Sequence, residues 1–291
     1  MGIFYEENGR VFTLQTRHST YQMKADGQGV LLHTYYGEKT DNTDLSCLIT
    51  RGDRGFSGNP FSMGGTDRTY SLDTFPQEYS CFGTGDYRIS ALKVQNADGS
   101  RAVSLRYAGH RIEKGKYDLP GLPAAYGTPE EAETLTVELK DEESGVAVRL
   151  YYGVFEELDV ITRAAQIINS GTEGVTLLKA ASLCLDWQAG EYDWITFHGR
   201  HAMERNFQRT GIAHGVQSVG SVRGASSHHY NPFVMLCDKN AGEEQGNCYG
   251  FSFVYSGEFL MEAEKDQMDQ TRLICGIHPD NFAWKLEPGE S

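Results

Sequence analysis

The sequence has little that would direct it to a membrane, to a nucleic acid or out of the cell. No apolar run approaches the roughly 20 residues that span a bilayer, and no basic segment followed by an apolar stretch opens the chain, so no signal peptide is visible. The 26 Lys and Arg face 40 Asp and Glu, and the net charge of −14 repels phosphate backbones and anionic lipid surfaces. We therefore expect a cytoplasmic protein that binds neither nucleic acid nor membrane.

Cysteine and metal-binding patterns are equally sparse. Without a secretion signal or CxxC spacing, the cysteines are expected to be reduced core thiols rather than a disulfide framework; they are Cys47, Cys81, Cys184, Cys237, Cys248 and Cys275. No HExxH motif occurs, and the adjacent His228 and His229 would point to opposite faces of a strand. We predict no metal and no cofactor.

Motifs for nucleophilic catalysis and for nucleotide binding are also missing. Gly-x-Ser-x-Gly does not occur, and the glycine-containing segment 215–224 lacks the Gly-Lys-Ser/Thr of a P-loop. A glycosidase needs two carboxylates about 5–10 Å apart, and 40 acids offer too many pairings to choose from. Asp186, Asp193 and Glu204 lie near aromatic residues that could stack on a sugar, although strand aromatics more often pack in a core.

Glycine and aromatic residues, by contrast, are plentiful. The 33 glycines are near 11% of the 291 residues, against an average of about 7%, and 16 tyrosines and 14 phenylalanines accompany them. Many turns and half-buried strands use these residues, which favours an all-β protein.

Period-2 alternation supports this interpretation. Segment 146–152 places Val146, Val148 and Leu150 on one face and Arg149 on the other. Segment 250–264 predicts a hairpin that turns at Ser256-Gly257-Glu258.

Two further segments, 160–171 and 175–187, are apolar on both faces, as expected for strands buried inside a sandwich. Only segment 128–135 has a helix start, with Thr128 as the cap and Pro129 in the first position. The sequence therefore predicts one large antiparallel β-sandwich with one short helix.

Five stretches, taken in order, resemble one family. They are YSLDTFPQEYSCFGTGDYR (70–88), FHGRHAMERN (197–206), GASSHHYNPF (224–233), YGFSFVYSGEF (249–259) and KLEPGES (285–291). They are similar to the N-terminal portion of the α-galactosidases of glycoside hydrolase family 36, and the resemblance runs from Tyr5 to the end.

The resemblance implies that residues 1–291 form a large β-supersandwich domain, similar to galactose mutarotase. A (β/α)₈ barrel with both catalytic aspartates and a small C-terminal β-domain follow in that family. Neither is found in this sequence, and the strand-and-turn ending FAWKLEPGES suggests a chain that continues into another domain. We therefore expect no catalytic residues here, and a domain that supports the barrel of an enzyme cleaving terminal α-galactosides such as melibiose and raffinose.

The resemblance also suggests where this domain meets its partners. Family members are commonly tetramers in which an N-terminal loop reaches the sugar pocket of a neighbouring subunit. The matching loop is 51–61, where Asp53 could accept hydrogen bonds from sugar hydroxyls and Phe56 could stack, although an ordinary surface loop is an equal alternative. We further hypothesise that a hydrogen-bonded loop shapes the surface beside the missing barrel; its residues are Ser226, Ser227, His228 and Asn231.

Two other functions stay open. A stand-alone carbohydrate-binding module would use exposed aromatic residues such as Trp187, Trp194 or Tyr230. A mutarotase-like enzyme would need a histidine acid and a glutamate base in one cleft; the candidates are His198, His201, His228 and Glu204.

Overall fold

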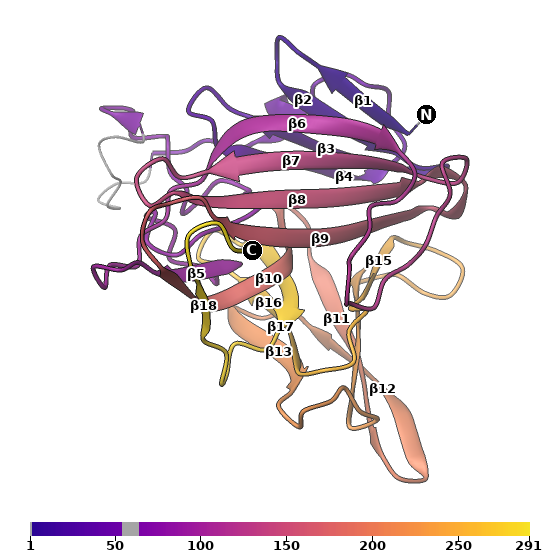
Figure 1. Ribbon diagram of the computed structural model, residues 1–291. Helices are drawn as coiled ribbons and strands as arrows, with labels where there is room; N and C mark the ends of the chain where they lie inside the picture. The colour runs from indigo at the N-terminus through magenta and orange to yellow at the C-terminus, as the bar shows by residue number, and fades with distance from the viewer. Residues whose placement is uncertain (1, 54–63) are drawn as a thin grey trace.

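The computed structural model describes residues 2–53 and 64–291, and these consist almost entirely of antiparallel sheets (Figure 1). Helical structure within this part of the chain is confined to short pieces, such as the 3₁₀ helices Ser46–Leu48 and Glu156–Leu158. Every pairing between named strands is antiparallel, so the expectation of an all-β antiparallel fold is confirmed.

Two of the four sheets are simple meanders in which neighbours in the chain pair side by side. The first has the order β1-β2-β3-β4, with bounds Ile3–Glu6, Val11–Gln15, Ser19–Ala25 and Leu31–Glu38. The second has the order β6-β7-β8-β9, with bounds Arg106–Lys114, Glu133–Lys140, Val146–Phe155 and Val160–Asn169.

The other two sheets combine strands from distant parts of the chain. One has the order β12-β11-β14-β15, with bounds Met203–Gly211, Tyr192–Arg200, Tyr230–Asp238 and Cys248–Ser252. The other has the order β13-β16-β17-β10-β18, with bounds Gly215–Ser221, Phe259–Lys265, Thr271–Ile277, Val175–Trp187 and Trp284–Leu286; β5, Leu92–Gln95, also pairs with β10.

One hydrophobic cluster draws side chains from all four sheets. Phe12, Val148, Leu185 and Leu236, one from each sheet, are at most 1% exposed. Burying a side chain of this size stabilises the fold by about 1.5–3 kcal/mol. The alternation predicted for 146–152 is confirmed, because its three apolar residues are buried while Arg149 stays half-exposed on the other face.

The short helix predicted over 128–135, of one or two turns, is limited to a single turn, and residues 133–135 belong to a strand. The carbonyl of Thr128 accepts hydrogen bonds from the N–H groups of Glu131 and Ala132, both at 3.1 Å, and the Glu131 carboxylate accepts the Thr128 N–H at 2.9 Å. The capping signal is therefore real, but it closes only one turn. Strand β7 begins at Glu133, because Leu135 is needed in the core opposite β8 and this tertiary packing outweighs the local helix preference.

The hairpin predicted over 250–264 is also wrong. Both halves are strands, but β15 pairs with β14, whereas β16 pairs with β13 and β17 in a different sheet. The connection 253–258 therefore crosses between sheets instead of reversing within one. Alternating hydrophobicity reports that a strand has one buried face, and it carries no information about which strand lies beside it.

The expectation that all six cysteines are reduced core thiols is corrected for three of them. A disulfide joins Cys237 to Cys248 across β14 and β15, and Cys47 is exposed. The other three, Cys81, Cys184 and Cys275, are free and buried as expected.

Candidate functional site

A two-stranded arm projects from the body of the molecule where β11 runs into β12 (Figure 1). We define the arm as residues 198–211. Strand β11 starts in the core, where Trp194 is 4% exposed, and β12 then pairs with β11 alone at the edge of its sheet. Both faces of β12 are open to solvent, with Met203 49% and Phe207 58% exposed. These two apolar side chains make the arm a candidate for contact with another protein surface.

The arm also differs in charge from the rest of the chain. It contains three arginines and one glutamate, a net charge of +2, so the remainder of the chain carries −16. A positive projection on a strongly negative protein favours an acidic partner surface.

One side chain fixes the base of the arm. Arg209, on β12, pairs with Asp193 of β11 at 2.6 Å between Nε and Oδ2. Its two terminal nitrogens donate to the carbonyls of Ala241 at 2.8 Å, Lys239 at 3.0 Å and Asp238 at 3.1 Å. The orientation of the arm therefore depends on the connection 238–247 between β14 and β15. Sequence reasoning missed this anchor, and the only signal for it was an arginine-rich stretch in an acidic chain.

The predicted hydrogen-bonded loop at 226–231 forms in part. The Ser226 N–H donates to the Ser256 carbonyl at 2.9 Å. The Ser227 hydroxyl accepts the N–H of His229 at 3.2 Å and lies 3.1 Å from its Nδ1. The carbonyl of His229 in turn accepts the N–H of Gly199, so this loop touches the base of the arm.

The other two residues of this loop, Asn231 and His228, lie in different surroundings. The Oδ1 atom of Asn231 is buried without a hydrogen-bond partner in the described residues. His228 is exposed and stacks on His229, with ring centroids 4.7 Å apart. The expectation that these histidines point to opposite faces of a strand is wrong, because they lie in the turn before β14. Partial desolvation and the neighbouring Arg223 and His228 lower the pKa of His229, so two imidazolium charges are disfavoured here.

The proposed sugar-contacting loop is only partly described. Asp53 is exposed, and its Oδ1 lies 2.9 Å from Nη2 and 3.1 Å from Nε of Arg68. The guanidinium therefore orients the carboxylate at the surface. Phe56 lies outside the described residues.

The tryptophans and carboxylates named for the alternative functions are occupied elsewhere in the fold. Trp187 and Trp194 are 7% and 4% exposed and pack in the core, which leaves Tyr230, at 47%, as the exposed member of that set. Asp186 pairs with Arg272, Asp193 with Arg209, and Glu204 accepts the backbone N–H of Ala202, so these carboxylates serve the fold.

A histidine–glutamate pair does exist, but in a place that sequence reasoning missed. His33 Nδ1 lies 3.3 Å from Glu78 Oε2, and both side chains are almost fully buried. Burial opposes ionisation of Glu78, yet Arg163, 2.8 Å away, and the hydrogen bonds around it hold the pKa of this carboxyl below its ordinary value. A sealed, ion-paired glutamate cannot act as a base on a sugar, so this cluster stabilises the core.

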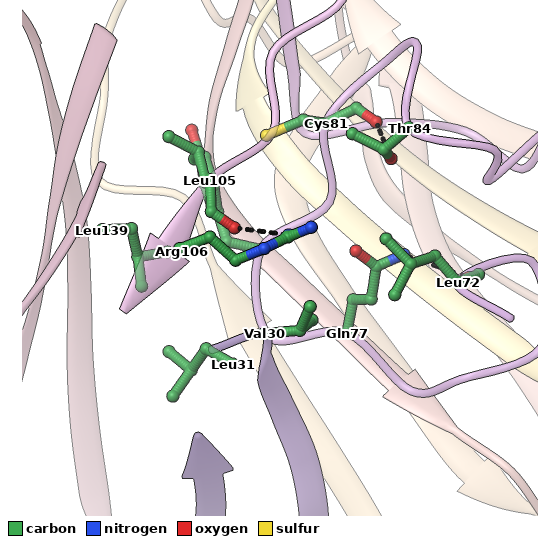
Figure 2. Close-up of a pocket in the computed structure, with 10 residues that line it drawn as sticks. Val30, Leu31, Leu72, Gln77, Cys81, Thr84, Leu105, Arg106 and Leu139 are labelled. Carbon is green, nitrogen blue, oxygen red and sulfur yellow. Dashed lines mark hydrogen bonds between the residues drawn. The ribbon is translucent and has the colours of Figure 1, made fainter. Parts of the chain in front are cut away.

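One cavity inside the described part of the chain is too small for a sugar. Its volume of about 10 Å³ has room for a single water molecule. Figure 2 shows Leu31, Leu72, Gln77 and Arg106 among the residues that line it. Among the described residues no group of three or more His, Cys, Asp or Glu is placed to hold a metal ion. None of the helices in this part of the chain has the length and apolar character needed to cross a bilayer.

Comparison with protein-family models assigns the chain to a family. A family model described as "Glycosyl hydrolase family 36 N-terminal domain" matches residues 29–287. The chain belongs to this family.

Curated relatives of the family 36 domain cover the whole chain. The bifunctional α-galactosidase/sucrose kinase AgaSK of Mediterraneibacter gnavus is 52% identical over 291 residues, which are 100% of this chain and 31% of the relative. α-Galactosidase AgaA of Geobacillus stearothermophilus is 44% identical over 292 residues, 100% of this chain and 40% of the relative. The resemblance expected from the motifs is thus confirmed.

Solved structures agree with the family 36 assignment. The galactosidase domain of AgaSK superimposes with a TM-score of 0.96 at 52% identity, covering 99% of this chain and 40% of that one. AgaB from Geobacillus stearothermophilus gives 0.94 at 45% identity, covering 100% and 39%. The chain therefore spans well under half the length of these relatives.

Proposed function

We propose that this chain is the non-catalytic N-terminal domain of a cytoplasmic α-galactosidase, and that it supports a catalytic barrel and the assembly of subunits. The observation that carries the proposal is the full-length match to less than half of each α-galactosidase relative. The described residues contain antiparallel sheets and no (β/α)₈ barrel, whose loops hold the reacting groups in barrel enzymes. A main hydrophobic cluster shared by four sheets supports a β-supersandwich of the mutarotase type.

The substrates in this proposal are terminal α-galactosides such as melibiose and the raffinose family. Support comes from a 45% identical relative, AgaA of Geobacillus stearothermophilus, variants of which have been solved with raffinose and with stachyose. The domain itself contributes no acid, base or nucleophile to the reaction. Its proposed contribution to the sugar site is loop 51–61, through Asp53, at a neighbouring subunit.

The arm is the proposed docking element of the domain. Its exposed Met203 and Phe207 offer apolar area, its arginines offer positive charge, and the Arg209 anchor holds both in one orientation. Loop 226–231 meets the arm at Gly199 and extends the same surface. Pre-organised apolar anchors with a charged rim are what stable protein interfaces use.

A chimera tests the proposal. This chain would replace the matching portion of AgaSK, and hydrolysis of p-nitrophenyl α-galactoside, melibiose and raffinose would be measured for the chimera, for this chain alone, and for AgaSK without that portion. We expect activity from the chimera only. Galactose release by this chain alone, or full activity of AgaSK without any N-terminal portion, would refute the supporting role.

Variants of the arm make the test specific. Phe207→Ser in the chimera should reduce assembly and activity, because an exposed anchor is lost while the isolated domain stays folded. The control is Leu158→Ser, which removes an apolar side chain that is 68% exposed on the 3₁₀ helix Glu156–Leu158. Equal behaviour of the two variants would show that the arm is not the docking element.

One observation favours a second function, carbohydrate binding by the domain itself. A surface hollow of about 240 Å³ is lined by Lys116, Asp118, Tyr126 and Glu131 on the β6–β7 connection. Tyr126 is 87% exposed, and an aromatic face beside carboxylates suits a sugar ring. This site replaces the buried tryptophans as the candidate for a binding module.

A further inference from the structure

The Cys237–Cys248 pair is placed for bond formation by the sheet itself. The two residues face each other in the β14–β15 register, with Cα atoms 4.1 Å apart, and each lies at the end of its strand. Directly opposed residues of an antiparallel pair come this close at non-hydrogen-bonded positions. Neither cysteine needs a movement of the backbone to meet the other.

The two sulfur-bearing residues differ in access. Cys237 is 4% exposed, whereas Cys248 is exposed on β15, the edge strand of its sheet. A thiol from solution can therefore reach the pair from the side of Cys248. Burial raises the pKa of the Cys81, Cys184 and Cys275 thiols, which keeps them protonated and unreactive.

The Cys237–Cys248 disulfide links the two ends of the connection 238–247, which anchors the arm. Cys237 and Cys248 flank residues 238–247, whose carbonyls at Asp238, Lys239 and Ala241 receive the guanidinium of Arg209. Inside the connection, the Asp238 N–H donates to the Asn247 carbonyl at 3.0 Å, and the Asn247 N–H donates to the Asp238 carboxylate at 3.1 Å. A covalent closure at the two ends restricts the opening of these bonds.

We propose that Cys237 and Cys248 form a reversible redox site that exchanges with low-molecular-weight thiols and disulfides and thereby tightens or loosens the anchor of the arm. In reduction, a small thiolate attacks the Cys248 sulfur, and Cys237 leaves as a thiolate that takes up a proton. A second small thiolate then attacks the sulfur of the first, and Cys248 leaves as a thiolate that takes up a proton, so two small thiols become one small disulfide and the chain gains two hydrogens. Oxidation runs through the same steps in reverse.

The test uses the isolated chain, so it does not depend on the proposed docking role. The chain is equilibrated with mixtures of reduced and oxidised glutathione, free thiols are trapped with N-ethylmaleimide, and the peptides are identified by mass spectrometry. We expect one reversible transition of the Cys237–Cys248 pair, with the three buried cysteines unlabelled throughout. In hydrogen exchange, amides of 238–247 and of β12 should exchange about tenfold more slowly in the oxidised form.

Two variants control this measurement. Cys248→Ser, at the exposed member of the pair, should abolish the redox dependence of amide exchange, and Cys47→Ser, at an exposed cysteine outside it, should leave that dependence intact. A pair that does not interconvert in the folded wild-type chain would overturn the proposal. So would oxidised and reduced chains with the same exchange rates in 238–247 and β12.

Discussion

Removal of Arg272 should destabilise the domain far more than removal of a comparable surface arginine. The Arg272 side chain is 1% exposed, and its Nε and Nη2 bind the two carboxylate oxygens of Asp186 at 2.7 Å each. Its Nη1 also contacts Asp86 at 2.8 Å and the Ile89 carbonyl at 2.9 Å. Arg272 on β17 lies directly opposite Asp186 on β10, so this ion pair joins two central strands.

The size of the expected loss in stability follows from the charges that remain after the substitution of Arg272. In Arg272→Met the buried Asp86 and Asp186 lose their main counter-charge. Within the described residues they then keep Arg88 as their ion-pair partner, 2.9 Å from Asp86 and 3.6 Å from Asp186. Removing one partner of a buried ion pair costs about 3–5 kcal/mol. A domain of this kind is stable by about 5–15 kcal/mol, so the loss is a large share of the total.

Urea unfolding followed by tryptophan fluorescence measures the effect, because Trp187 and Trp194 are buried in the fold. The control is Arg149→Met, whose pair with Glu138 is 3.6 Å long and 43% exposed on both sides; we expect a change below about 1 kcal/mol. If Arg272→Met does not fold, Arg272→Lys, which keeps the charge, should show an intermediate loss. Equal stabilities of Arg272→Met and Arg149→Met would refute the reasoning.

Three further predictions concern pH and ligands. The folded pKa values of Glu78 and Asp86 lie below their ordinary 4.5 and 3.8 because nearby arginines outweigh burial, so their stabilisation is complete above those values and is lost as the pH falls below them. Burial raises the pKa values of the half-buried Glu264 and the buried Asp266, and these two carboxyls oppose the trend. The urea midpoint should still drop below pH about 4.5, and a rise would contradict the prediction. In the AgaSK chimera, Asp53→Asn should raise KM about tenfold with assembly unchanged, and an unaltered KM would remove loop 51–61 from the sugar site. If galactose or raffinose binds at the surface hollow, calorimetry should show a heat of binding for the wild-type chain that is lost in Tyr126→Ala. Identical traces for the two chains would exclude that site.

Sequence reasoning found strands such as β8 because the covered face of the strand is encoded by its own residues. The inward Val146, Val148 and Leu150 are visible in the sequence, and so is the outward Arg149. Sequence reasoning failed at 128–135, where the capping residues close a single turn and strand β7 begins directly after it. The candidate site was less predictable, because the arm depends on Arg209 reaching carbonyls about 30 residues further along the chain.

The sequence alone determined the all-β class, the family and the acidic charge, since these depend on composition, alternation and ordered motifs. Only the tertiary structure decided which strands are neighbours, and with that which polar groups meet. It placed β15 and β16 in different sheets, brought Cys237 opposite Cys248, and sealed His33 and Glu78 in the core. The physical reason is that burial of a face is a local property of a segment, whereas hydrogen-bond partners, ion pairs and disulfides are chosen by segments far apart in the chain.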